Sequence, residues 1–335
     1  MFDFHVIGGE TARRVIGRTR PQIVEEVRRT YLAHDRGDTV NPNSYFLRFP
    51  DKPDSRIIAL PAYLGGEHSV AGIKWIASFP ANIEEGIPRA SAALLLNDYR
   101  TGYPFACLEA SQISAARTAA SAVLAARTLT GGRHARRLAV VGAGIIARNI
   151  LEFFAAENWT VDVCAVHDRE PKYAEALAAF AADELGLRTE TADDLDAAVA
   201  DADVVVLATT AAAPYITRPG TFAPGQVVLN VSLRDVGPDI VLESCNVVDD
   251  VDHCLTASTS PHLAEQQCGN RDFVTGTLAQ VMDGQVEVDA GRPVIFSPFG
   301  LGVLDLAVGM HVHRAALEAG EAVSVDGFFG ETRRW

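Results

Sequence analysis

From residue 138 onwards, short apolar runs alternate with longer segments of helical periodicity. Near-continuous apolar residues occupy 138–141, 161–166, 204–207 and 227–231, and helical patterns lie between them at 145–157, 173–184 and 193–200. Uninterrupted apolar runs of this length are typical of strands that are buried on both faces. Strands that alternate with helices predict an α/β fold with a doubly wound parallel sheet.

The first part of the chain has a different texture. Residues 1 to about 110 mix strand-like runs, such as 56–61 and 92–98, with turn signals, and the first clear helix is predicted at 21–34. An Ala-rich helix is predicted at 111–129, where Gly131 and Gly132 end it. Small residues on several of its faces allow close packing, so we expect this helix to run between two domains.

The last helical pattern, at about 303–317, follows the end of the predicted sheet, and we expect it to return to the first domain. The predicted organisation is a doubly wound domain at 119–303 and a discontinuous α+β domain made of 1–118 and 304–335. The length of 335 residues suits two domains that each bury a core.

Charge and composition exclude several classes of function. Lys and Arg total 29 against 43 Asp and Glu, a net charge of −14, which argues against nucleic acid and against anionic membranes as partners. The uncharged stretch 204–217 is too short to span a bilayer, and the first residues show no secretion signal. Five cysteines without a C-x-x-C pair suit a reducing compartment, so we expect a cytoplasmic protein.

A dinucleotide fingerprint follows the first apolar run directly and opens a helix. Its sequence is Gly142-Ala143-Gly144-Ile145-Ile146-Ala147, which matches G-x-G-x-x-A in the required context. The first glycine permits a tight turn, and the second lets the backbone approach a pyrophosphate held on helix N–H groups. We therefore predict a Rossmann-type domain that binds a dinucleotide.

Polar residues at the ends of later strands extend this predicted site. Asp168 follows Gly144 by 24 residues, where a carboxylate accepts hydrogen bonds from ribose hydroxyls and favours NAD. Arg169 beside it favours NADP instead if it holds a 2′-phosphate. Thr209, Thr210 and Ser232 also end strands, and either cofactor contact or strand-end capping accounts for them.

Two basic residues stand in apolar surroundings. Lys74 lies in a strand-like run whose other members favour burial, and Arg117 lies among alanines in the middle of a helix. A buried lysine is costly unless it is paired, so each residue is either part of a catalytic site or one half of an ion pair.

Motifs along nearly the whole chain resemble the ornithine cyclodeaminase/μ-crystallin family. They are Gly72-Ile73-Lys74-Trp75, the segment 113–120, Val141-Gly142-Ala143-Gly144, and Ser297-Pro298-Phe299-Gly300 with Asp305. The resemblance implies a substrate-binding and dimerisation domain at 1–118 and 304–335 and an NAD-binding Rossmann domain at 119–303. It also implies an amino or imino acid substrate, NAD(P)(H) as cofactor, and a homodimer or higher homo-oligomer.

Further motifs resemble one branch of that family, the N-(2-amino-2-carboxyethyl)-L-glutamate dehydrogenases. They lie at 56–61, 65–68, 72–76, 89–91, 96–98 and 109–111. The branch oxidises the glutamate Cα–N bond with NAD and hydrolyses the imine to 2-oxoglutarate and 2,3-diaminopropionate, in siderophore and peptide-antibiotic pathways. Alternatives within the family are a ketimine reductase, an alanine dehydrogenase-like enzyme and an ornithine cyclodeaminase, and a nucleotide-binding protein without turnover is a further one.

The resemblance implies roles for individual residues. Lys74 corresponds to a lysine that binds a substrate carboxylate or polarises a carbonyl, and Arg117 to an arginine that meets a substrate carboxylate. Asp235 corresponds to an acidic residue that holds the substrate amine and orients the attacking water, with Lys74 as the alternative base. Asp305 is interpreted as structural or as lying near the nicotinamide.

The chain departs from the family pattern at two places. Ser44 stands where the family has an early arginine, so Arg48 or Arg56 is expected to bind that carboxylate, with Arg56 favoured. The segment Ser232-Leu233-Arg234 lacks the Gly-Gly that precedes the aspartate of ornithine cyclodeaminases, which argues against cyclisation of ornithine. His311 and His313 are two apart on a predicted helix and make a poor metal pair, so no metal is predicted.

Overall fold

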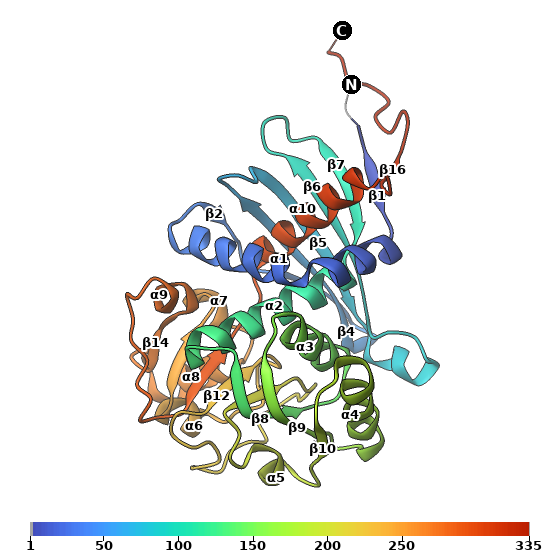
Figure 1. The fold of residues 1–335 in the computed structure, drawn as a ribbon. Coiled ribbons are helices and arrows are strands. Elements are labelled where there is room, and N and C mark those ends of the chain that lie inside the picture. The colour runs from blue at the N-terminus through green and yellow to red at the C-terminus, as the bar shows by residue number, and fades with distance from the viewer. Residues whose placement is uncertain (1–2, 335) are drawn as a thin grey trace. The chain divides into compact units, whose positions relative to one another are not determined.

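The computed structural model describes residues 3–334 and divides the chain into two compact units (Figure 1). The first unit contains the residues up to Arg117 together with those from Leu301 onwards, and the second runs from Thr118 to Gly300. Both crossings lie at helices, inside α2 (Ser111–Thr130) and just before α10 (Gly302–Glu318). Each unit is described by itself below.

The second unit is built on an eight-stranded parallel sheet. Its strand order is β10-β9-β8-β11-β12-β15-β13-β14. The strands are β8 (His134–Val141), β9 (Thr160–His167), β10 (Thr189–Thr191), β11 (Val204–Leu207), β12 (Val227–Asn230), β13 (Cys245–Val248), β14 (Val274–Thr277) and β15 (Val294–Ser297). The helices are α3 (Ile145–Ala156), α4 (Pro171–Leu185), α5 (Leu195–Val199), α6 (Pro238–Glu243), α7 (Val251–Cys254), α8 (Ser260–Cys268) and α9 (Leu278–Met282). The prediction of a doubly wound parallel sheet is confirmed.

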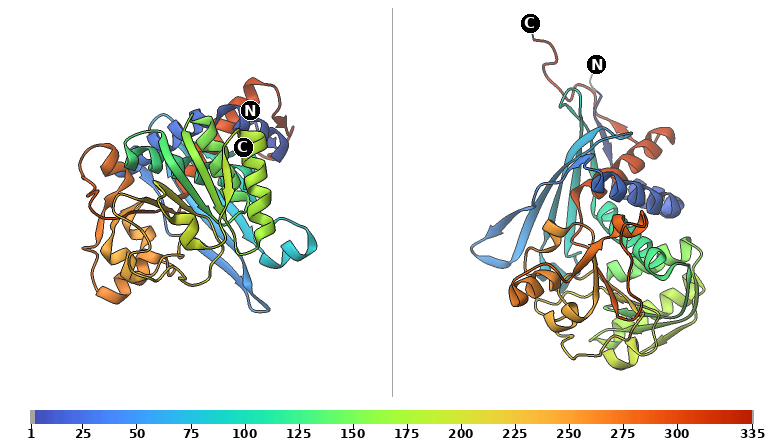
Figure 2. Two further views of the ribbon diagram at one scale, coloured as in Figure 1. Left: turned by 60° about the horizontal axis from the view of Figure 1, so that its bottom comes forward. Right: turned by 90° about the vertical axis from the view of Figure 1, so that its left-hand side faces the viewer.

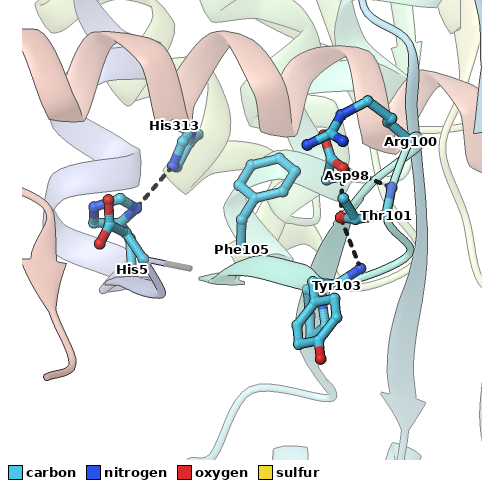
Figure 3. Close-up of a pocket in the computed structure, with 9 residues that line it drawn as sticks. His5, Asp98, Arg100, Thr101, Tyr103, Phe105 and His313 are labelled. Atoms are coloured by element: carbon cyan, nitrogen blue, oxygen red, sulfur yellow. Dashed lines mark hydrogen bonds between the residues drawn. The ribbon is translucent and has the colours of Figure 1, made fainter. Parts of the chain in front are cut away.

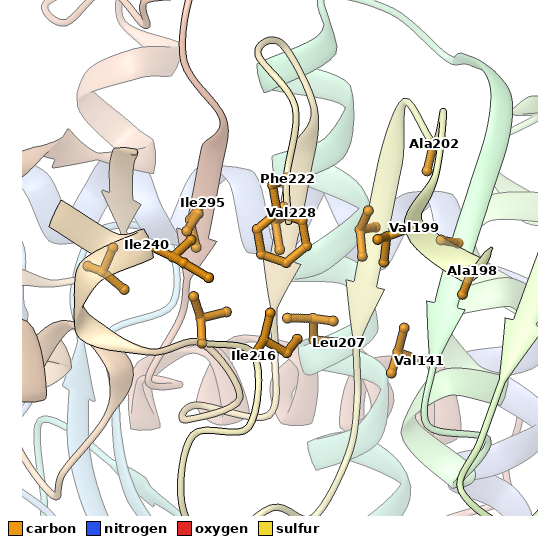
Figure 4. Packing of buried hydrophobic residues seen from close by; sticks show 14 of the residues in the cluster. Val141, Ala198, Val199, Ala202, Leu207, Ile216, Phe222, Val228, Ile240 and Ile295 are labelled. Carbon is orange, nitrogen blue, oxygen red and sulfur yellow. The ribbon is translucent and has the colours of Figure 1, made fainter. Parts of the chain in front are cut away.

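One hydrophobic cluster shows how this sheet is held (Figure 4). Parallel register sets Val205 beside Ala139 and Val228, so alternate residues of neighbouring strands share a face. These residues pack with residues of the helices that cover this face, among them Ala198 and Val199 of α5, Ile240 and Val241 of α6, and Ala264 of α8. Every residue of β11 and β12 is buried, so both faces of the central strands are covered. Full burial of a Val or Ile side chain stabilises the fold by about 1.5–3 kcal/mol. The buried strands thereby hold in place the polar residues that follow their ends.

The strand order reverses at β8, which has β9 on one side and β11 on the other. In open parallel sheets, ligands bind outside the carboxyl ends of the strands at such a switch point. The glycine-rich segment after β8 and the threonines after β11 both lie at this position.

The first unit contains a mixed sheet of eight strands. Their order is β16-β1-β7-β6-β5-β4-β2, with β3 paired to β4, and only the β1–β7 pair is parallel. The strands are β1 (His5–Ile7), β2 (Thr39–Val40), β3 (Tyr45–Phe49), β4 (Lys52–Leu64), β5 (Val70–Ser78), β6 (Ala90–Asp98), β7 (Pro104–Glu109) and β16 (Val323–Ser324). The helices of this unit are α1 (Gly9–Asp35), the 3₁₀ helix Pro80–Glu85, α10, and the first part of α2.

Helices α1 and α10 pack against each other on one side of this sheet, and α10 crosses β4, β5 and β6 (Figure 2). Glycine lets α10 approach closely, since a Cβ at Gly309 would clash with the side chain of Leu94. Asp305 precedes Gly309 by four residues, so both lie on the α10 face that meets the sheet. The close approach therefore brings a carboxylate against the sheet.

The predicted start of the first helix, at Pro21, is wrong. Helix α1 begins at Gly9 and is kinked at Thr19, which has non-helical angles (φ −129°, ψ 24°). A proline inside a helix removes a hydrogen bond and clashes with the carbonyl four residues earlier, so helices containing one usually kink there. Here the carbonyl of Gly17 accepts a hydrogen bond from the Arg20 side chain instead.

Candidate active site

Lys74 is buried in the middle of β5, between Leu60 of β4 and Leu94 of β6. Its Nζ lies 2.7 Å from Asp305 Oδ2 and donates to Ser114 Oγ at 3.1 Å, and the residue is 1% exposed. Burial lowers the pKa of Lys74 to about 8, although the Asp305 carboxylate acts in the opposite direction. Lys74 is therefore protonated at neutral pH, but it releases its proton more readily than an ordinary lysine does.

Arg117 binds the other oxygen of the same carboxylate. Its Nε donates to Asp305 Oδ1 at 3.2 Å, across 188 residues of sequence. Asp305 is fully buried and thus bridges the two basic residues that the sequence singled out. With Lys74 protonated, the cluster of Lys74, Arg117 and Asp305 carries one positive charge in excess, which suits an anionic ligand.

The interpretation of Asp305 as structural or near the nicotinamide did not identify this pairing. One signal was present in the sequence, because Asp305 is the single charged residue in an otherwise apolar stretch, 301–309. A buried carboxylate requires a partner, and the two basic residues in apolar surroundings were available.

Arg48 and Arg56 lie further along the same face of the sheet. Register pairs them directly across β3 and β4, and Arg56 precedes Leu60 by an even number of residues, so both side chains share the face of Lys74. Arg56 and Leu60 are four positions apart along the strand, which is about 13 Å of backbone. The structure therefore puts these arginines on the face of Lys74 without bringing them into contact with it.

A third guanidinium lies at this end of the sheet. Arg89 Nε donates to Ser78 Oγ at 3.1 Å, and Ser78 is the cross-strand partner of Arg56. Sequence reasoning did not single out Arg89, because nothing in a single strand shows which residue is opposite.

The fingerprint of the second unit has the backbone that a dinucleotide requires. Gly142 has φ +91°, and a Cβ there would lie 2.7 Å from Ala208 O, so no other residue fits. Gly144 is the N-cap of α3 without a side-chain cap, and a Cβ there would meet nothing within 4 Å. The first N–H groups of α3 thus face open space beside a glycine backbone, which fits a pyrophosphate. Ala143, Ile145 and Ile146 complete the loop, and Ile145 is largely exposed.

Asp168 lies at the end of β9, where the sequence predicted a ribose contact. Its Oδ2 accepts from Ala143 N–H at 2.8 Å, and its Oδ1 accepts from Glu170 N–H at 2.9 Å. Each carboxylate oxygen retains a second lone pair for a ribose hydroxyl. Arg169 beside it is exposed.

Asp235 is buried after β12 and is surrounded by hydroxyl groups. Thr209 Oγ1 donates to both carboxylate oxygens, at 2.9 and 2.8 Å, and Tyr215 Oη donates to Oδ2 at 3.2 Å. Burial raises the pKa of Asp235, and the hydroxyls of Ser232, Thr209 and Tyr215 oppose that rise. A carboxyl of this kind takes up a proton at a higher pH than an exposed aspartate does.

The three strand-end hydroxyls that the sequence left open differ in the structure. Thr209 binds Asp235, whereas Ser232 Oγ donates to Leu207 O at 3.1 Å and so caps the end of β11. Thr210 is exposed at the same edge of the sheet. Tyr215 was missed, since an aromatic residue in a loop carries no signal of its partner.

A cavity of about 500 Å³ lies elsewhere in the first unit (Figure 3). Within it, His313 Nε2 lies 3.5 Å from His5 Nδ1, and burial together with His5 lowers the pKa of His313 to about 4. Its lining contains none of the predicted site residues. Over residues 3–334, no three His, Cys, Asp or Glu side chains are grouped to hold a metal ion, and no helix is long and apolar enough to cross a membrane.

The fold and these sites define an α/β protein whose second unit has the features of a dinucleotide-binding domain and whose first unit carries a buried basic cluster. The model of the ornithine cyclodeaminase/mu-crystallin family matches residues 13–320. The N-((2S)-2-amino-2-carboxyethyl)-L-glutamate dehydrogenase of Staphylococcus aureus (strain NCTC 8325 / PS 47) is 29% identical over 307 residues, 88% of this chain and 89% of that protein.

Solved structures show the same fold. The Delta(1)-pyrroline-2-carboxylate reductase of Thermococcus litoralis, in complex with NADH and L-proline, superposes with a TM-score of 0.88 at 24% identity, covering 96% of this chain and all of that one. The structure of CmnK superposes with a TM-score of 0.86 at 28% identity, covering 98% of this chain and all of that one.

This chain belongs to the ornithine cyclodeaminase/mu-crystallin family. It is an oxidoreductase that uses a nicotinamide adenine dinucleotide as its cofactor.

Proposed function

We propose that this chain oxidises N-(2-amino-2-carboxyethyl)-L-glutamate with NAD and hydrolyses the resulting imine. The products are 2-oxoglutarate and L-2,3-diaminopropionate, which serves as a precursor in siderophore or peptide natural-product biosynthesis. A protein with five free cysteines suits the reducing cytoplasm, which is the compartment we propose.

The observation that carries the proposal is that several cations share one face of a sheet in an acidic protein. The chain has a net charge of −14, yet Lys74, Arg117, Arg48 and Arg56 are gathered in the first unit, three of them on one face of its sheet. A substrate with three carboxylates needs several cations at once, and guanidinium groups bind carboxylates bidentately. A substrate with a single carboxylate would not require the arginines beyond Arg117.

The proposed chemistry assigns a task to each residue. Arg117 and Lys74 bind a substrate carboxylate and orient the glutamate Cα–H, a positioning effect that contributes to the rate. Bound NAD supplies a hydride acceptor for that Cα–H. Asp235 takes the proton of the water molecule that adds to the imine, and Lys74, whose pKa is about 8, is the alternative base.

The cofactor assignment rests on Asp168. A carboxylate at the end of the second strand accepts hydrogen bonds from the ribose hydroxyls and repels a 2′-phosphate, which favours NAD over NADP. Gly142, Ala143, Gly144, Ile145 and Ile146 are proposed to hold the pyrophosphate, and Arg169, Thr209, Thr210 and Ser232 to lie at the cofactor edge.

The decisive experiment supplies the purified protein with NAD and one candidate substrate at a time. With the glutamate adduct, we expect the absorbance of reduced nicotinamide to rise and mass spectrometry to detect 2-oxoglutarate and 2,3-diaminopropionate in equal amounts. Ammonia from ornithine without net NADH would instead identify a cyclodeaminase. Turnover of alanine or of a cyclic imine alone would identify the other family activities, and each of these results contradicts the proposal.

We also propose that the first unit pairs with a second copy of the chain. The sheet face opposite α10 exposes Tyr45, Leu47 and Trp75, and register aligns Tyr45, Ala59, Trp75 and Ala93 across four strands. An apolar face of this kind is typical of an interface. Light scattering should report a dimer or larger homo-oligomer that Trp75→Glu dissociates and that Ile145→Glu, at an exposed residue of the other unit, does not.

A further inference from the structure

Tyr215 contacts Asp235 through both its backbone and its side chain. The N–H groups of Tyr215 and Ile216 donate to Asp235 O at 3.1 and 3.0 Å, and Ile216 forms an isolated parallel bridge with Val236. The phenol hydroxyl of Tyr215 donates to the carboxylate at Oδ2. Residues 215 and 216 therefore hold both the backbone carbonyl and the side-chain carboxylate of Asp235.

The loop that carries Asp235 has a strained backbone. Leu233, two residues earlier, has φ +74°, a left-handed conformation that residues with a Cβ rarely adopt. Its carbonyl accepts from Ser260 N–H at 2.7 Å. Strained conformations persist where the surrounding structure determines them and are concentrated at functional sites.

Hydroxyl groups alone offset the charge of this carboxylate. Among residues 3–334, the side chains that act on Asp235 are the hydroxyl-bearing Ser232, Thr209 and Tyr215. Arg234, next to it in sequence, directs its guanidinium to Ala257 O at 3.0 Å. Asp168 is the further charged group near this network, and it acts on Tyr215.

Asp235 and its hydrogen-bond partner Tyr215 differ in their exposure to solvent. Asp235 is fully buried, whereas Tyr215 is 44% exposed. The phenol is therefore the partner of Asp235 that reaches the surface of the second unit.

We propose that Tyr215, together with Thr209, is a positioning residue for Asp235, holding its carboxylate in place and stabilising the ionised form. This inference rests on the proposed function in one respect, which is that Asp235 accepts the proton of the attacking water. Burial together with the Asp235 carboxylate raises the pKa of Tyr215, so its hydroxyl remains a donor at neutral and moderately alkaline pH. A donor to the carboxylate favours the ionised form, so its loss shifts protonation of Asp235 to higher pH.

The test compares Tyr215→Phe with Tyr173→Phe, which removes the hydroxyl of a similarly exposed tyrosine on α4. Carbon-13 NMR of protein labelled at aspartate carboxyls follows the titration, and Asp235→Asn assigns the Asp235 signal. We expect Tyr215→Phe to raise the titration midpoint of Asp235 by about one pH unit and Tyr173→Phe to leave it unchanged. The acid limb of kcat/KM should move by the same amount, while the affinity for NAD stays constant.

A second hydroxyl gives an independent variant in case Tyr215→Phe does not fold. Thr209→Val should also raise the midpoint, and Thr209→Ser, which restores the donor, should return it to the wild-type value. Titration curves of Tyr215→Phe or Thr209→Val that superpose on the wild type would overturn the inference. If the midpoints move but the wild-type enzyme does not turn over the glutamate adduct, the inference holds and the proposed function fails.

Discussion

Each unit of this protein contains an aspartate that is fully buried near the candidate site, and the two are stabilised in opposite ways. Asp305 of the first unit lies between Lys74 at 2.7 Å and Arg117 at 3.2 Å. Among residues 3–334, the side chains that act on Asp235 of the second unit are the hydroxyls of Ser232, Thr209 and Tyr215. One carboxylate is balanced by charge and the other by neutral dipoles.

The difference matters for what each group can do. A buried ion pair is tightly coupled, since removal of one partner leaves an uncompensated charge, so Asp305 is suited to fixing two cations in one geometry. A buried carboxyl without a cation changes its protonation state more easily, because its neutral form is the one that burial favours. We therefore propose binding and orientation of the substrate for the cluster of the first unit and proton transfer for Asp235 of the second.

Replacing Lys74 by Ala should have the largest effect of the changes considered. We expect turnover of the glutamate adduct to fall by about 10²–10⁴-fold, since the variant loses a charged group that orients substrate or transfers a proton. The affinity for NAD should not change, because the fingerprint lies in the second unit. Steady-state kinetics and calorimetric NAD titration measure the two quantities, and retained turnover would show that the active site is misplaced.

Replacing Asp305 by Asn should destabilise the fold. The variant leaves Lys74 and Arg117 buried without their shared anion, and breaking a buried pair of this kind costs about 3–5 kcal/mol. Chemical denaturation measures the free energy of unfolding.

Asp196→Asn is the matched control for this variant, since it breaks an exposed pair with Arg218 and should cost no more than about 1 kcal/mol. Equal losses in the two variants would contradict the view that Asp305 is the centre of the basic cluster.

Much of the second unit could be predicted from its sequence because the relevant signals are local. Buried parallel strands show as uninterrupted apolar runs, and the fingerprint combines a strand, a glycine turn and a helix within a few residues. The strands β10, β13, β14 and β15 were not predicted, since they have only three or four residues each and include polar ones. The start of α1 was wrong because Pro21 was read as a first helical residue, whereas it follows a kink at Thr19.

The contacts of the candidate sites depend on pairings that no local pattern contains. Lys74 and Arg117 stood out as basic residues in apolar surroundings, but their common partner lies 188 residues beyond Arg117 on α10. The hydroxyl of Tyr215 meets Asp235 across 20 residues of sequence, beside the bridge that Ile216 forms with Val236. The catalytic and binding roles of all these residues stay predictions until they are measured.

The first unit should respond to pH through Lys74. The pKa of Lys74 is lowered from 10.5 to about 8, so the ammonium that binds a substrate carboxylate is lost as the pH rises through about 8. We expect the KM for the adduct to rise above this pH, by up to about tenfold per pH unit, whereas the affinity for NAD should stay constant.

The same shift has a definite sign for stability. Between pH 8 and 10.5 the unfolded chain binds the Lys74 proton and the folded chain does not, so the contribution of Lys74 to folding becomes more favourable as the pH rises. Lys74→Met should remove this slope from the pH dependence of unfolding. A slope identical to the wild type would mean that Lys74 titrates normally in the folded chain.

The smallest effect is expected from a change that tests the second unit alone. Replacing Asp168 by Ser removes the carboxylate that we propose to bind the ribose hydroxyls and to repel a 2′-phosphate, so NAD should bind about tenfold more weakly while NADP binds better. Glu170→Ser, two residues along the same loop, changes the net charge equally and should leave the preference for NAD intact. If Asp168→Ser leaves the ratio of the two affinities unchanged, Asp168 does not read the ribose, and its bond to Ala143 N–H serves only to hold the glycine loop.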